Sequence, residues 1–108
     1  MGCSWDLEAS GDLRSIVRVK VVGEGVVGVE VEVPNGPPLV LLRGRNGIVA
    51  CGFLDVAVAD KLGVVAARAF GVKSVEELLE KEIVEATSRA RELGIREGVR
   101  VRDIVKVI

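Results

Sequence analysis

Valine alternates with polar or small residues on both sides of a glycine-rich turn, and this pattern constrains the fold more than any other feature. The turn lies at residues 23–25, with Arg18 and Lys20 between the valines of the first arm and Glu30 in the second. The alternating valines are Val17, Val19, Val21, Val27, Val29 and Val31. Such alternation around glycine predicts an antiparallel β-hairpin over residues 14–33. The cationic side chains then face glutamate across the strands, which supports this register.

Downstream of the hairpin, the pattern predicts a strand-helix-strand unit. The continuous apolar run at residues 39–42 is typical of a strand that is covered on both faces, and residues 48–51 form the next strand. Asp55 fits the N-cap of a short helix that stops at Gly63. Residues 64–70 then form a strand, although their alanines also allow a helix.

The last third of the chain predicts helices. Ser74 and Glu77 have the spacing of a capping box, and apolar residues then recur at helical intervals as far as position 93. This stretch fits one long helix or two helices with a break near Lys81. Beyond Gly98, a final amphipathic helix competes with a strand, because residues 99–102 alternate between valine and arginine.

Together these patterns predict a single α+β domain over residues 1–108. An N-terminal antiparallel β-hairpin or meander comes first, followed by the strand-helix-strand unit and the C-terminal helices. Residues 1–13 are acidic, contain a solitary Trp5 and are expected to form a weakly ordered lead-in.

The composition removes several kinds of chemistry and several classes of partner. His and Tyr are absent, so the commonest general base and metal ligand are missing, and two cysteines cannot supply the roughly four ligands of a structural zinc. We therefore expect no metal and no cofactor. A net charge of −1 and 3% aromatic residues argue against nucleic acid. No apolar run approaches the roughly 20 residues of a membrane span.

The same composition indicates where such a protein works. Cys3 and Cys51 lie far apart and are expected to be reduced thiols in a cytoplasmic protein. Many charged residues and few amides are typical of proteins from hot environments.

Cys51 is the strongest candidate for chemistry. It closes a predicted strand and is followed by Gly52, which gives a substrate close access to the backbone, and by the helix cap Asp55. Arg68 or a neighbouring subunit would complete such a ligand or thiol site. The competing interpretation is a buried structural thiol, because free cysteine is among the most buried residue types and the Asp55 charge opposes a thiolate.

Two segments and three shorter matches between residues 47 and 99 suggest a family. Residues 47–54 contain a Cys-Gly-aromatic-Leu segment and residues 90–95 contain Glu-Leu-Gly-Ile, with shorter matches at positions 71–72, 78–79 and 98–99. These segments resemble the YunC-like family, a small bacterial and archaeal domain of unknown function, over about residues 35–108. Its members more usually have Tyr, Met and Tyr where this chain has Ile48, Ala50 and Phe53. The resemblance implies an N-terminal β region that mediates tetramerisation, which matches the hairpin, and it implies no known activity.

Two functions therefore compete. The favoured one is a homo-oligomeric binding or scaffold protein, expected to be a tetramer, with no identifiable catalytic machinery and with the six hairpin valines as its contact surface. A lone hairpin is marginal in water, so its valine face needs cover from the rest of the domain or from another subunit. The alternative is a small-ligand enzyme or thiol-dependent site centred on Cys51.

Overall fold

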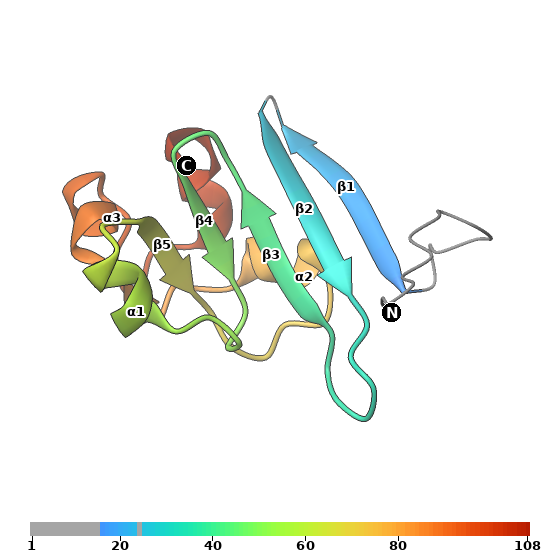
Figure 1. Ribbon diagram of the computed structural model, residues 1–108. Coiled ribbons are helices and arrows are strands. Elements are labelled where there is room, and N and C mark those ends of the chain that lie inside the picture. The colour runs from blue at the N-terminus through green and yellow to red at the C-terminus, as the bar shows by residue number, and fades with distance from the viewer. Residues whose placement is uncertain (1–15, 24) are drawn as a thin grey trace, which may run out of the picture.

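The fold is built around a mixed β-sheet (Figure 1). The computed structural model describes residues 16–23 and 25–108, and within them the sheet has six strands in the order β1-β2-β3-β4-β5-β6. β4 and β5 are parallel, and the other neighbouring pairs are antiparallel. The strands are β1 (Val17–Gly23), β2 (Val26–Val31), β3 (Leu39–Arg43), β4 (Gly47–Ala50), β5 (Val65–Arg68) and β6 (Glu85–Ala86). The α+β architecture predicted from the sequence is confirmed.

β1 and β2 form the predicted hairpin. Val17 pairs with Val31 and Val19 with Val29, so the valines of the two strands share one face. β3 adds to β2 in antiparallel fashion and extends the hairpin into a meander. The predicted lead-in of residues 1–13 lies outside the described residues, as do positions 14, 15 and 24.

The strand-helix-strand unit is also confirmed, as β4, α1 (Val56–Lys61) and β5. The Asp55 carboxylate caps α1 by accepting a hydrogen bond from the Val58 amide at 3.2 Å. Gly63 follows the helix with a φ of 73°, a left-handed conformation that favours glycine and ends the helix. The helical alternative for residues 64–70 is wrong, because the segment pairs in register with β4.

The long helix considered for residues 75–93 does not form. Instead α2 (Val75–Glu80) ends at Lys81, β6 follows, and α3 (Ser88–Glu92) begins after Thr87. The Thr87 hydroxyl accepts a hydrogen bond from the Ala66 amide at 3.1 Å and donates one to the Val64 carbonyl at 2.7 Å. These bonds hold the chain against β5 and interrupt the helical path, so the two-helix alternative is confirmed.

The final segment is a 3-10 helix, η1 (Val101–Val107), in place of the predicted amphipathic α-helix or strand. The strand alternative survives only as an isolated bridge between Glu82 and Arg100. Val101, Ile104 and Ile108 are buried, so the apolar spacing seen in the sequence does turn one side of η1 inward.

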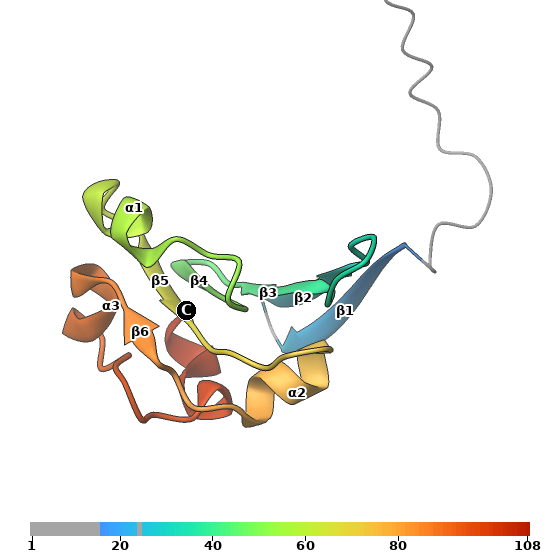
Figure 2. The same ribbon diagram turned by 90° about the horizontal axis from the view of Figure 1, so that it is seen from below.

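The helices cover the two faces of the sheet unequally (Figure 2). α2, α3 and η1 lie on one face, and the main apolar core fills the space beneath them. α1 lies on the opposite face, over the β5 end of the sheet. β3 is therefore covered on one face only, which corrects the two-sided prediction. Its Val40 and Leu42 are fully buried toward the helices, whereas Leu39 and Leu41 are half-buried on the other face.

Candidate functional sites

The face of β1–β3 opposite α2 is an apolar surface that no helix of the described chain covers (Figure 2). The six valines predicted for assembly all lie on it, in the cross-strand pairs Val17–Val31, Val19–Val29 and Val21–Val27. Val19 is 66% exposed and Val21 is 82% exposed. We call these six residues the open valine face.

The charged residues of the same hairpin point the other way, toward α2. Glu30 is 2% exposed and receives hydrogen bonds from Arg18 Nε at 2.6 Å and from Lys20 Nζ at 2.9 Å. The Val75 amide, at the start of α2, donates a third bond at 2.7 Å. The Lys20 ammonium also binds Glu76 in α2 at 2.9 Å. The hairpin is therefore attached to α2 in part by ion pairs and a backbone hydrogen bond, and not by the six valines of the open valine face.

These contacts set the electrostatics of the hairpin. Burial on its own would raise the pKa of Glu30, but the bonds from Lys20, Arg18 and the Val75 amide outweigh it and lower that pKa to about 2. The hydrogen bond that Lys20 donates to Glu30, followed by the one it donates to Glu76, raises the pKa of Lys20. Glu30 is consequently an anion at all ordinary pH values.

The Val75 side chain packs directly on the backbone of β2 beside this network. A Cβ atom on Gly28 would lie 2.7 Å from both Cγ atoms of Val75, so only glycine lets the start of α2 pack directly onto β2. In the sequence, Gly28 stands between Val27 and Val29, where the alternating pattern of the strand would otherwise place a side chain.

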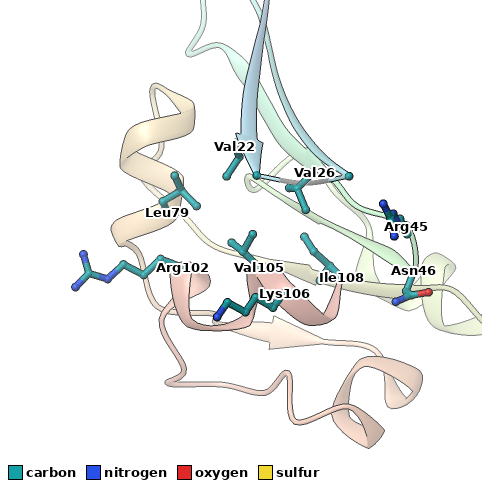
Figure 3. A pocket seen from close by; sticks show the side chains of 11 residues that line it. Val22, Val26, Arg45, Asn46, Leu79, Arg102, Val105, Lys106 and Ile108 are labelled. Carbon is teal, nitrogen blue, oxygen red and sulfur yellow. The ribbon is translucent and has the colours of Figure 1, made fainter.

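A groove opens at the turn end of the hairpin, between β1, β2, α2 and η1 (Figure 3). Its volume is about 730 Å³. Apolar side chains from these elements form the floor: Val22, Val26, Leu79, Val105 and Ile108. Arg45, Asn46, Arg102 and Lys106 complete the lining.

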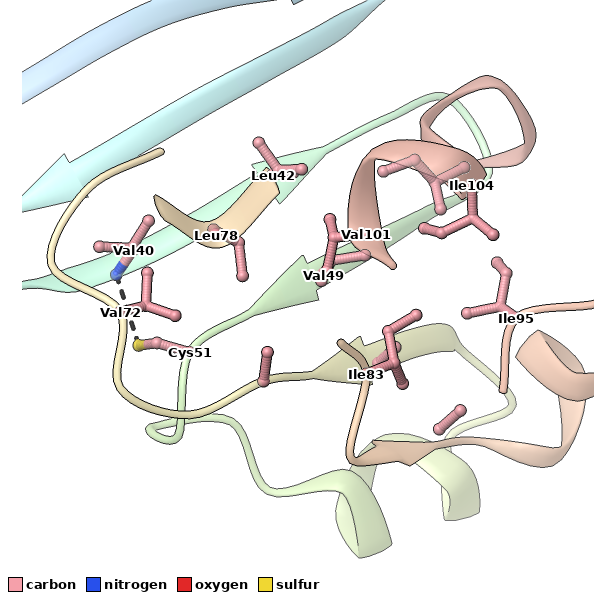
Figure 4. Packing of buried hydrophobic residues seen from close by; sticks show 14 of the residues in the cluster. Val40, Leu42, Val49, Cys51, Val72, Leu78, Ile83, Ile95, Val101 and Ile104 are labelled. Carbon is pink, nitrogen blue, oxygen red and sulfur yellow. Dashed lines mark hydrogen bonds between the residues drawn. The ribbon is translucent and has the colours of Figure 1, made fainter. Parts of the chain in front are cut away.

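Cys51 lies behind the end of β4 and is 4% exposed (Figure 4). Its thiol is free, and the Val40 amide donates a hydrogen bond to Sγ at 3.4 Å. The residue also contributes to the wall of a cavity of about 350 Å³. That wall consists of Pro37, Pro38, Cys51, Gly52, Phe53, Phe70, Gly71, Val72 and Lys73. Cys51 is thus buried and at the same time borders a cleft, so the two interpretations of it are not exclusive.

The structure brings two of the four predicted site residues into that cavity. Gly52 lines it beside Cys51, and a Cβ there would lie 2.8 Å from the Phe70 ring, so glycine makes room for the aromatic wall. Asp55 is not part of the lining and serves as the cap of α1. Arg68 lies under the wall, with its guanidinium 5.0 Å from the centre of the Phe70 ring.

Arg68 is held in place by contacts away from the cavity. One guanidinium nitrogen donates to the Leu54 carbonyl at 2.8 Å and another pairs with Glu85. Its Nε is buried without a hydrogen-bond partner. Arg68 therefore supports Phe70 and ties the loop after β4 to β6, rather than reaching the thiol.

Sequence reasoning missed the remaining residues of the cavity. The aromatic pair Phe53 and Phe70 is 17 positions apart, and only the parallel pairing of β4 with β5 brings the two residues together. Lys73, on the same wall, follows β5 without any motif to mark it. The one available signal was the scarcity of aromatic residues, which makes two phenylalanines near a cysteine notable.

Two further facts bear on the classes of function. In residues 16–23 and 25–108, the helices are too short or too polar to cross a bilayer. Within the same residues, groups of three or more His, Cys, Asp or Glu side chains do not gather where they could hold a metal ion.

Comparison with known proteins places this fold in a family. The family model described as "Domain of unknown function (DUF1805)" matches residues 50–108. The chain is 31% identical over 93 residues to the "Uncharacterized protein YunC" of Bacillus subtilis (strain 168), which covers 82% of this chain and 91% of that protein. The crystal structure of the protein of unknown function TA1206 from Thermoplasma acidophilum superposes with a TM-score of 0.79 at 26% identity, covering 85% of this chain and 92% of that one. The chain therefore belongs to the DUF1805 family, the YunC-like proteins.

Proposed function

We propose that this protein is the subunit of a homo-oligomeric binding or scaffold protein, assembled through the open valine face. The observation that carries the proposal is the orientation of the hairpin: Glu30 is buried against α2, whereas Val19 and Val21 are 66% and 82% exposed. An isolated domain gains nothing from this orientation, because it leaves apolar surface in water. A second copy that stacks on the same face recovers that free energy.

The edge of the sheet adds to this argument. Among the described residues, β1 is an outer strand of the sheet, and the outer edge of such a strand offers backbone groups for pairing with another chain. Face stacking and edge pairing together provide two distinct contacts, which is what a closed tetramer with two kinds of interface requires. We therefore favour a tetramer. A cytoplasmic location agrees with the free thiol of Cys51.

The test is the mass of the protein in solution, measured by light scattering and sedimentation at micromolar concentration. The double variant V19K/V21K places charges on the open valine face, and L62K is the control because Leu62, after α1, is 72% exposed. We expect an oligomer for the native chain and for L62K, and monomers with native circular dichroism for V19K/V21K. A native chain that is monomeric, or an assembly that V19K/V21K leaves intact, would contradict the proposal.

The cavity beside Cys51 favours a second candidate, a small-ligand or thiol-dependent site. Its volume of about 350 Å³ and its largely apolar wall fall within the range of ligand pockets, about 300–1,000 Å³. In a C3S background, Cys51 alone reports on this site. Alkylation of the native protein by iodoacetamide at a rate near that of the urea-unfolded chain would support the candidate, whereas labelling only after unfolding would remove it.

A further inference from the structure

We infer that the groove at the turn end of the hairpin binds an organic anion with an apolar body. The groove lies on the side of the sheet that carries α2 and η1, and its lining contains none of the six valines of the open valine face. Binding there is therefore separate from assembly. At about 730 Å³, the groove is of a size that holds a small organic molecule.

The charges around the groove favour an anion. Its described lining contains the three cationic residues Arg45, Arg102 and Lys106 and no acidic side chain. Arg102 pairs with Glu80 at 3.1 Å, but Arg45 and Lys106 form no ion pair or hydrogen bond through their side chains with any described residue. Unpaired cations beside apolar surface raise the local positive potential and select ligands of opposite charge.

The floor favours an apolar body on that anion. Val22 and Val26 come from the hairpin, Leu79 from α2 and Val105 from η1, and their side chains converge in Figure 3. A ligand that covers them removes apolar surface from water, which favours binding. A small inorganic ion would leave this surface exposed, so a carboxylate, sulfonate or phosphate attached to an aliphatic or aromatic body fits better.

Backbone hydrogen bonds hold the β3–β4 turn, which carries Arg45 and Asn46, at the edge of the groove. The Gly47 amide donates to the main-chain oxygen of Ile108 at 3.2 Å, and the Asn46 amide donates to the same oxygen, so the β3–β4 turn is fixed to the residue that follows η1. A Cβ on Gly25 would lie 2.6 Å from Arg45 Nε, which shows that the Arg45 side chain lies across the hairpin turn. One side of the groove, formed by the β3–β4 turn and the residue after η1, is therefore fixed by hydrogen bonds.

The test uses two probes of nearly equal shape. 1-Anilinonaphthalene-8-sulfonate carries an anionic group, whereas N-phenyl-1-naphthylamine is its neutral counterpart, and the fluorescence of both rises on binding. The variant R45Q/K106Q removes the two unpaired cations, and K61Q/R89Q is the control because it removes one Lys and one Arg elsewhere. We expect R45Q/K106Q to weaken binding of the sulfonate by about tenfold or more, with the neutral probe and the control variant little changed.

Amide chemical shifts then locate the probe. On addition of the sulfonate, shifts at Gly25 and Lys106 support the groove, whereas shifts confined to Val19 and Val21 assign the probe to the open valine face and overturn the inference. Equal loss of sulfonate binding in the two double variants, or no loss in either, also overturns it. Glu24 adjoins the lining in sequence and lies outside the described residues, so E24Q is measured beside them as a third charge variant.

Discussion

The two ends of the sheet differ in how many of their faces the helices cover. At the β4–β5 end, α3 and η1 lie on one face and α1 on the other, and Val49, Ala66 and Ala67 are fully buried. At the β1–β3 end, helix α2 covers one face and the opposite face is open. Apart from Arg68, β4 and β5 consist of small and apolar residues, whereas β1 and β2 alternate valine with charged or small residues over most of their length. Alternation therefore reports that two faces differ, without saying which of them the domain buries.

At the β1–β3 end, the buried Glu30 and its partners help to attach the hairpin to α2. Lowering the pH should therefore produce the largest effect among the tests of this comparison. Because the pKa of Glu30 falls to about 2 in the folded protein from an ordinary value of 4.5, its contribution to stability is complete above pH 4.5 and is lost as the pH falls toward 2. The loss amounts to about 3 kcal/mol. Urea unfolding across this pH range measures it.

The matched variants for this experiment are E30Q and E32Q. Glu32 pairs with the same Arg18, but its side chain is 46% exposed. We expect E30Q to flatten the acid dependence of the free energy of unfolding and E32Q to leave most of it. An equally steep dependence in E30Q would show that the acid sensitivity arises elsewhere.

Shortening one valine at each end provides the second test. Val49 is 0% exposed in β4, and Val21 is 82% exposed in β1. We expect V49A to lower the free energy of unfolding by about 2–3 kcal/mol, through lost burial and the cavity left behind. V21A should change the stability of the dissociated chain by less than about 0.5 kcal/mol. Similar losses for both would mean that the open valine face is covered within one subunit.

A third test concerns two glycines of the hairpin. In G28A the new Cβ would meet Val75 and push α2 away from β2, at a cost of about 1–3 kcal/mol. Gly23 is the control, because a Cβ there has no neighbour within 4 Å. G23A should therefore be neutral or slightly stabilising, since it restricts the unfolded chain. Thermal unfolding of the two variants compares them directly, and equal effects would exclude close packing at Gly28 as the cause.

Much of the fold follows from local pattern alone. The hairpin, the strand-helix-strand unit and the caps at Asp55 and Ser74 depend on residues close in sequence, and all are present. The interruption of the long helix was less predictable, because apolar residues repeat at helical spacing on both sides of Lys81. What separates α2 from α3 is the hydrogen bonding of Thr87 to β5, a contact across 21 positions.

The candidate sites were harder to predict for the same reason. Cys51 and Gly52 are marked by their sequence, but the Phe53–Phe70 wall exists only once β4 and β5 pair. The burial of Glu30 could not be predicted from the sequence either. A glutamate between valines has the pattern of a solvated face, and only the Val75 amide and the two cations of β1 make its burial favourable.

The smallest expected effect separates the two roles considered for Asp55. As the cap of α1, Asp55 satisfies the Val58 amide, so D55A should cost about 1 kcal/mol and speed hydrogen exchange in the first turn of α1. D55N retains the accepting oxygen and should restore most of this stability, as asparagine caps helices equally well. Because Asp55 is outside the cavity lining, the alkylation rate of native Cys51 should be the same in D55N and in the unaltered chain. A changed rate in D55N, with unchanged stability, would instead place the Asp55 charge beside the thiol and return it to the candidate site.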